Sequence, residues 1–303
     1  EYGWYWEDDI GKNNGINNTG MAETSAGYTG DEAGLISTCT TPFVFNDKLY
    51  MINFDGTITS IVTAVTGLAA ELVGQGAVAS EYLKPMYTTL QYPQKLWCYD
   101  DTTGKFEEVE SFSQYMTDTC NEYLWRASVY DNQLYISTMD SAVLYKYITI
   151  LKGENFTSLT DTEIDTAITS IESLISTLDS IAAINTQIAE LQNILEQLTV
   201  MMEEYKQVKN DVTKFNEFVV KYEELIIKVE ALSSLLDSDS TASIPGFTEL
   251  ADFYSKVDWT GLKMYAYIVR LVKNDIMGFD LLRTSDGVNF EVVTNSGFHD
   301  KYN

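Results

Sequence analysis

The chain has 303 residues, of which 45% are hydrophobic, enough to bury one large core or two ordinary ones. Its 45 acidic residues outnumber its 19 basic residues, and the formal net charge is -26. This balance argues against nucleic acid and against an anionic membrane surface, because phosphate is bound by lysine and arginine. No run of about 18 apolar residues occurs, so the sequence predicts no transmembrane helix.

Several features of the sequence favour an extracellular or cell-surface location. The chain begins at Glu1 instead of Met, and two triplets match the N-glycosylation sequon, at Asn17 and Asn155. The sequence therefore predicts glycosylation at these two asparagines. The cysteine count is odd, so one disulfide with one free thiol and three buried thiols both remain open for Cys39, Cys98 and Cys120.

A β-hairpin motif occurs twice in the chain. Residues 1–41 are rich in Gly, Asn and Thr, which predicts irregular structure. Residues 42–56 then contain Val44-Phe45-Asn46-Asp47-Lys48-Leu49-Tyr50, and residues 129–135 repeat this as Val129-Tyr130-Asp131-Asn132-Gln133-Leu134-Tyr135. Each copy reads as a strand, a two-residue polar turn and a second strand. A repeated hairpin is typical of a repeat architecture.

A second kind of hairpin also occurs twice. Small and apolar residues at 60–72 predict a short helix, and a connector containing Pro and Tyr follows it. Residues 96–109 form strand, turn and strand around Gly104, and residues 279–293 repeat the pattern around Gly287. Glycine supplies the positive φ that such turns need.

The segment between Gly153 and Gly246 has a different character. Its apolar residues recur at alternating steps of four and three, the spacing of a coiled-coil seam, which slips near 178–184 and near 205–208. An antiparallel helical hairpin broken near one of the slips buries its own apolar stripe, so we expect it in preference to one long helix. Thr160 and Glu163 have the spacing of a capping box. The acids of the first part and the lysines after residue 205 favour packing of the two parts against each other.

The alternating hairpins resemble the blades of a β-propeller. The turn Thr284-Ser285-Asp286-Gly287-Val288-Asn289-Phe290 is similar to a shortened Asp box of sialidase-type propellers, and residues 124–138 resemble the inner strands of exported propeller proteins on microbial cell surfaces. The resemblance implies a mainly β fold, a complete or incomplete propeller into which the antiparallel helical hairpin is inserted. The expected domains are an irregular segment at 1–41, propeller-like blades at 42–158, the helical arm at 159–238, and a propeller-like continuation at 239–303 that ends partway through a repeat.

Calcium is the one cofactor that the sequence favours. Two acidic loops offer oxygen ligands, from Asp100 and Asp101 in the first loop and from Asn53 and Asp55 in the second. Neither loop has the EF-hand spacing. Turn chemistry is the alternative explanation, because Asp, Asn and Gly are common in turns for conformational reasons.

No catalytic motif stands out. The chain has a single histidine, His299, and no Gly-x-Ser-x-Gly elbow. A sialidase-like site would need Arg126, Arg270 and Arg283 to converge, since these are its only arginines. We therefore expect a structural or adhesive protein and not an enzyme, with a propeller-type, sialidase-like glycoside hydrolase as the alternative.

The helical segment is the expected contact with a partner. Met201, Met202 and Tyr205 cluster at the second slip, and methionine adapts well to partner surfaces. These residues could equally pack around a helix end. The expected partners are further copies of this chain, or a protein or glycan of the cell surface.

Overall fold

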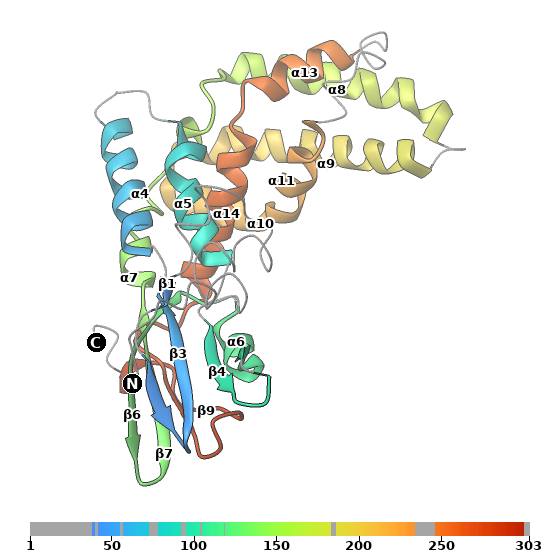
Figure 1. Cartoon of the computed structure of the whole chain (residues 1–303). Helices are drawn as coiled ribbons and strands as arrows, with labels where there is room; N and C mark the ends of the chain where they lie inside the picture. The colour runs from blue at the N-terminus through green and yellow to red at the C-terminus, as the bar shows by residue number, and fades with distance from the viewer. Residues whose placement is uncertain are drawn as a thin grey trace, which may run out of the picture. The chain divides into compact units, whose positions relative to one another are not determined.

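The computed structural model describes residues 38–39, 42–54, 57–72, 78–91, 95–103, 105–117, 119–182, 186–233 and 246–299 (Figure 1). The chain divides into two compact units. Unit 1 comprises residues 1–66, 85–147 and 271–303, and unit 2 comprises residues 67–84 and 148–270. Three of the boundaries between the units fall inside helices, namely α4 (Thr57–Leu72), α5 (Ala79–Gln91) and α14 (Trp259–Asn274).

The repeated hairpin is confirmed in unit 1. In the first copy β2 (Phe43–Phe45) pairs with β3 (Lys48–Phe54), and in the second β6 (Asn121–Tyr130) pairs with β7 (Gln133–Asp140). Both central residues of each turn have positive φ: 49° and 59° at Asn46 and Asp47, and 48° and 58° at Asp131 and Asn132. A two-residue turn of this kind matches the right-handed twist of the strands, and Asn and Asp tolerate its backbone conformation.

The second kind of hairpin is confirmed as well. It joins β4 (Leu96–Asp100) to β5 (Lys105–Glu108), and β8 (Leu281–Thr284) to β9 (Glu291–Thr294). One sheet has the order β1-β3-β4-β5, where the short strand β1 (Thr38–Cys39) and β2 pair with successive parts of β3. The other sheet has the order β6-β7-β8-β9. Residues 148–270, which make up most of unit 2, are thus inserted between two adjacent strands.

The two copies of the first hairpin bury opposite faces. Tyr50 is 0% exposed while Leu49 is 36% exposed, whereas in the second copy Leu134 is the residue at 0%. Tyr50 and Ile52 of one sheet share a core with Leu134 and Ile136 of the other. Because side chains alternate between the faces of a strand, the same Leu-Tyr pair contributes its tyrosine to the core once and its leucine once.

The expected β-propeller is wrong. Of the described residues, 58% are helical and 19% lie in strands, so the protein is not mainly β. The described part of the chain contains two small sheets, whereas a propeller needs at least about four blades. The resemblance to exported propeller proteins rested on hairpins, which are local, and the number and closure of sheets depend on contacts that hairpin sequences do not encode.

Unit 2 contains the predicted helical hairpin. Helices α8 (Asp161–Ala182) and α9 (Thr186–Val208) lie side by side (Figure 1). Lys206 and Lys209 near the end of α9 bind Asp165 and Asp161 near the start of α8, so the two helices are antiparallel. The first helix ends within the first predicted slip and the second ends at the second slip. The capping box is present, because the Glu163 amide donates to Thr160 Oγ1 (3.3 Å) and the Thr160 amide to Glu163 Oε2 (2.9 Å).

Further helices complete unit 2. Helices α10 (Val212–Lys221) and α11 (Glu223–Glu230) contact α9, and α13 (Phe247–Ser255) contacts α8. Helices α13 and α14 therefore occupy much of the 239–303 segment, which was expected to continue the propeller. The connector after residue 72 contains α5, with Pro85 inside the helix.

The remaining short elements are α6 (Glu110–Met116), which contacts β4, α7 (Ala142–Tyr145), and the 3-10 turns η2 (Gly153–Asn155) and η3 (Gly297–His299). None of the described helices is both long enough and apolar enough to cross a membrane.

Candidate functional site

An open groove of about 800 Å³ lies in unit 1, between the β4–β5 hairpin, the first turn of α6 and the turn that joins β8 to β9. We call it the acidic groove, because five carboxylates and one lysine line it. These charged residues are Asp100, Asp101, Glu107, Glu108, Glu110 and Lys48.

One wall of the acidic groove is a turn built around Asp286. Asp286 Oδ1 accepts hydrogen bonds from the amides of Val288 and Asn289 (2.8 Å each), and Oδ2 accepts one from Asn289 Nδ2 (2.7 Å). These bonds hold the pKa of Asp286 well below its usual range. Ser111 Oγ of α6 also donates to the Val288 carbonyl oxygen. The wall is therefore held both internally and from α6.

The acidic groove is negatively charged at neutral pH. The Asp100 carboxylate accepts a hydrogen bond from the Thr102 amide (2.8 Å), which lowers its pKa. Glu108 pairs with Lys95 at 2.7 Å, whereas Asp101, Glu107 and Glu110 are exposed. Grouped carboxylates that face open solvent attract cationic groups and repel anionic ones.

The acidic groove does not pair a nucleophile with a base. Its one thiol, Cys98, lies 3.7 Å from the Tyr99 carbonyl oxygen, and burial raises its pKa, so it is a protonated and weak nucleophile. His299 is exposed in η3 and is not among the residues that line the groove. Cys98 and Cys120 are not joined to each other by a disulfide, and the side chain of Cys39 lies outside the described residues.

The two predicted calcium loops are not brought together. Asp100 and Asp101 line the acidic groove, whereas Asn53 pairs with Cys39 near the far end of β3. Since Tyr50 faces Cys98, Asp100 lies opposite residue 48, about 17 Å along the strand from Asn53. Asp55 lies outside the described residues. Within the part of the chain that the structure covers, no three Asp, Glu, His or Cys residues are placed to hold a metal ion.

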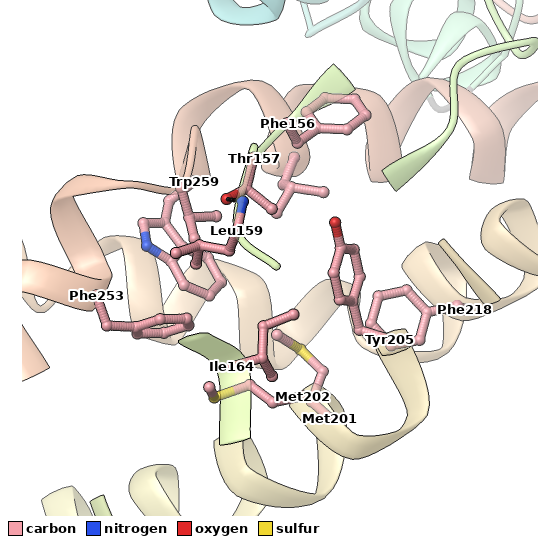
Figure 2. Close-up of a pocket in the computed structure, with 12 residues that line it drawn as sticks. Phe156, Thr157, Leu159, Ile164, Met201, Met202, Tyr205, Phe218, Phe253 and Trp259 are labelled. Atoms are coloured by element: carbon pink, nitrogen blue, oxygen red, sulfur yellow. Dashed lines mark hydrogen bonds between the residues drawn. The ribbon is translucent and has the colours of Figure 1, made fainter. Parts of the chain in front are cut away.

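The predicted partner-binding residues lie inside unit 2. Met201, Met202 and Tyr205 are 4%, 3% and 9% exposed, and they line a small apolar cavity of about 30 Å³ (Figure 2). Ile164 and Trp259 lie on other sides of this cavity. The three residues are brought together, but they face the core of unit 2.

The Tyr205 hydroxyl is buried, and none of the described residues forms a hydrogen bond with it. Figure 2 shows it directed toward the side of the cavity where Phe156 and Thr157 lie. Burial raises the pKa of Tyr205 above its ordinary value. The cavity has about the volume of one water molecule, but a buried water needs two or more polar partners. The buried Tyr205 hydroxyl therefore destabilises the folded state.

Asn155 of the second sequon is held by hydrogen bonds. Its Nδ2 donates to Glu71 Oε1 (2.6 Å) and its Oδ1 accepts from the Lys152 amide (2.8 Å). Phe156, the middle residue of the sequon, is 2% exposed. A glycan at Asn155 would have to displace the bond to Glu71. Asn17 lies outside the described residues.

The arginines are engaged in separate ion pairs. Arg270 in unit 2 binds Glu223 at 2.8 Å, and Arg283 in unit 1 binds Glu291 at 2.5 Å. Arg126 is exposed on β6.

Sequence reasoning did not find the glutamates of the acidic groove. The acidic run at 107–110 was visible, but only the tertiary structure places it beside the Asp286 turn.

Comparison of the sequence and the structure with known proteins found no match: no family model, no curated protein and no solved structure is significantly similar to this chain.

Proposed function

We propose that this chain is a non-catalytic structural or adhesive protein of the cell surface or the extracellular space, and that it binds a basic segment of a partner protein in the acidic groove of unit 1. The observation that carries the proposal is the groove itself, with about 800 Å³ of open volume and five carboxylates against one lysine.

The size and charge of the acidic groove favour a basic peptide. Its volume lies within the usual range of binding sites, about 300–1,000 Å³, and accommodates several side chains. Exposed Asp101, Glu107 and Glu110 form no ion pair with a side chain that the structure describes, so they can bind Lys or Arg of a partner directly.

The overall charge selects against some partners. A net charge of -26 makes two copies of the chain repel each other at low ionic strength, and it repels acidic polysaccharides equally. A basic partner protein gains from the same field, which raises its association rate.

Binding without turnover is favoured by the chemistry of the acidic groove. Its thiol is protonated and it holds no histidine, so no thiol–imidazole pair exists among the residues that line it. Incubation with sialosides and polysaccharides, followed by analysis of released sugars, tests this part of the proposal, and sustained turnover would contradict it.

Calorimetry on the full chain with a decalysine peptide tests the proposed site. The variant Asp101→Asn/Glu107→Gln/Glu110→Gln removes three carboxylates of the acidic groove. We expect its affinity for the peptide to fall by about threefold to a hundredfold at low salt, because each of the three exposed pairs contributes roughly 0.2–1 kcal/mol.

The matched control is Glu172→Gln/Glu190→Gln/Glu217→Gln, which removes three exposed carboxylates from the helices of unit 2. Both variants change the net charge by the same amount. Equal weakening in the two variants would show that the peptide senses only the overall charge, and the proposed site would be wrong.

The proposed location has its own test. Asn17 and Asn155 are the sequon asparagines, and the side chain of Asn155 is hydrogen-bonded to Glu71. For protein from its natural source, we expect a glycosidase to reduce the apparent mass of the wild type but not that of Asn17→Gln. An unchanged mass in the wild type would remove this support for an extracellular location.

A further inference from the structure

Three aspartates of unit 1 gather around the segment 275–280, through which the chain passes from α14 to β8. They are Asp140 at the end of β7, and Asp275 and Asp280 at the two ends of the segment. Each is tied to the others by a hydrogen bond or by electrostatic repulsion. None of them lines the acidic groove.

The carboxyl groups of Asp140 and Asp275 lie close enough for each to shift the pKa of the other, and no described group donates a hydrogen bond to the buried Oδ2 of Asp275. A buried carboxylate oxygen without a donor, beside a second carboxyl group, favours a proton on one of the two. Asp140 accepts the amide of Ala142 at Oδ1 and that of Gly278 at Oδ2, both at 2.7 Å, so it is the anion of the pair. Asp275 therefore carries the proton.

Asp280 fixes the other end of the segment. It is 3% exposed, and its Oδ2 accepts hydrogen bonds from Tyr115 Oη (2.7 Å) and from Asn121 Nδ2 (2.8 Å). Its amide donates to Thr138 Oγ1 at 2.9 Å. The segment 275–280 is thus held at both ends and at Gly278, each time through a carboxyl group.

The surroundings of the cluster keep a proton bound near neutral pH. Burial, with the charge of Asp140 as the second cause, raises the pKa of Asp275 to about 7. Burial also raises the pKa of Asp280 to about 6, and raises that of Asp140. The charged or titratable groups that face the three aspartates from neighbouring elements are Lys146, whose charge favours the Asp140 anion, and Tyr115 of α6.

We propose that Asp140, Asp275 and Asp280 form a pH-operated latch, which holds segment 275–280 on unit 1 while Asp275 is protonated and releases it when Asp275 ionises. Loss of the proton leaves two neighbouring carboxylates that repel each other, and the segment moves to separate them. The latch lies where the chain re-enters unit 1 after unit 2. It does not depend on the proposed binding function.

The sign of the pH effect follows from the raised pKa of Asp275. A carboxyl group whose pKa is higher in the folded than in the unfolded state stabilises the folded state. Its contribution is complete at pH values below the unfolded pKa, and for Asp275 it is lost as the pH rises through about 7. The latch is therefore closed at pH 5.5 and open at pH 8.

Hydrogen exchange of the backbone amides of residues 276–280 in the full chain, corrected for intrinsic rates, tests the latch. We expect protection of these amides to fall about tenfold between pH 5.5 and pH 8, since pH 8 lies about one unit above the pKa of Asp275. The variant Asp275→Asn keeps a donor toward Asp140 and carries no charge, so its protection should stay nearly constant over this range. The matched control Glu172→Gln, at an exposed position outside the latch and the acidic groove, should behave as the wild type.

Two results would overturn the proposal. One is a pH dependence in Asp275→Asn equal to that of the wild type, and the other is protection that rises with pH. If Asp275→Asn does not fold, the carboxyl carbon shift of Asp275 in the wild type decides, because a midpoint below pH 5 would mean that the latch is open at every physiological pH.

Discussion

Units 1 and 2 bury different kinds of side chain. Unit 1 buries polar groups together with its apolar core, among them Asn121, Thr138 and Asp280, each below 9% exposed. Unit 2 has an aromatic cluster at its centre, in which the ring of Phe215 lies 5.8–6.4 Å from those of Phe156, Phe218, Tyr205 and Tyr265. Its lysines and acids pair at the surface of its helices, as Lys206 does with Asp165.

The difference indicates where each unit responds to its surroundings. Aromatic burial stabilises unit 2 with little dependence on pH or salt. The buried carboxyl groups of unit 1 and the open carboxylates of its acidic groove respond to protons and to cations. Both proposals therefore concern unit 1, and four predictions examine the contrast, from the largest expected effect to the smallest.

The first prediction removes the centre of the aromatic cluster. Phe215 is 0% exposed, and Phe215→Ala should lower the free energy of unfolding by about 3–5 kcal/mol, because it deletes a buried ring and leaves a cavity. Urea denaturation followed by helical circular dichroism measures the loss. The control Ile227→Ala, at 45% exposure, should cost less than about 0.5 kcal/mol. A loss below about 1 kcal/mol in Phe215→Ala would show that the cluster is not the core of unit 2.

The second prediction removes a buried carboxyl group from unit 1. Asp280→Ala leaves Tyr115 Oη and Asn121 Nδ2 without their acceptor, and should cost about 2–3 kcal/mol at pH 5. Asp280→Asn is the matched control, because its amide oxygen can still accept one of these bonds, and it should cost clearly less. Equal losses in urea denaturation would mean that the hydrogen bonds to Asp280 contribute nothing.

The third prediction concerns the Tyr205 hydroxyl, a buried polar group of unit 2 with which no described residue forms a hydrogen bond. Tyr205→Phe should raise the free energy of unfolding by about 1 kcal/mol, since it removes a desolvated hydroxyl and keeps the ring. The matched control is Tyr265→Phe, whose hydroxyl lies 2.7 Å from Asn216 Oδ1, and it should cost about 1 kcal/mol. Loss of stability in both variants would show that the Tyr205 hydroxyl is hydrogen-bonded in solution.

The fourth prediction concerns unit 2, where we expect stability to depend on pH with the opposite sign to that of the latch in unit 1. Hydrogen bonds from Thr160 lower the pKa of Glu163, and the bond to Lys221 lowers that of Glu204. A carboxyl group whose pKa is lower in the folded state stabilises the folded state at pH values above its unfolded pKa. This contribution is lost as the pH falls through the folded pKa. Unit 2 should therefore lose a little stability below about pH 4, under conditions where the latch of unit 1 is closed.

The variant Glu163→Gln checks this sign. Thermal unfolding between pH 5 and pH 3 should depend less on pH in Glu163→Gln than in the wild type, while Glu172→Gln, at an exposed position of the same helix, should match the wild type. If thermal unfolding depends on pH equally in Glu163→Gln and in the wild type, the capping box does not cause the pH dependence.

Local structure was predictable from the sequence where the physics is local. The Asn46-Asp47 and Asp131-Asn132 turns predicted two hairpins, and the seam predicted a helical hairpin broken near one of its slips, where α8 gives way to α9. The charge asymmetry predicted contact between the two helices, which Lys206 and Asp165 make. Each prediction used residues within a few positions of one another, or a pattern that continues over several turns.

The wrong predictions concern arrangement. The hairpins indicated a propeller, but the number of sheets depends on how their faces pack, and the Leu-Tyr motif buries its tyrosine in one copy and its leucine in the other. The segment after residue 72 was expected to be a connector containing Pro and Tyr, yet it contains α5, which continues through Pro85. A proline removes one backbone hydrogen bond, and tertiary packing compensates for that loss.

Sequence alone determined the hairpins, a helical hairpin with its break near a seam slip, the capping box and the acidity of this chain, because turn chemistry, periodicity and charge act over short distances. Tertiary structure alone decided the sheets, the acidic groove and the aspartate cluster. Asp140 and Asp275 are separated by all of α8 to α14 along the chain and yet their carboxyl groups interact. No local rule brings such residues together, since their interaction exists only after the separate segments of unit 1 have folded together.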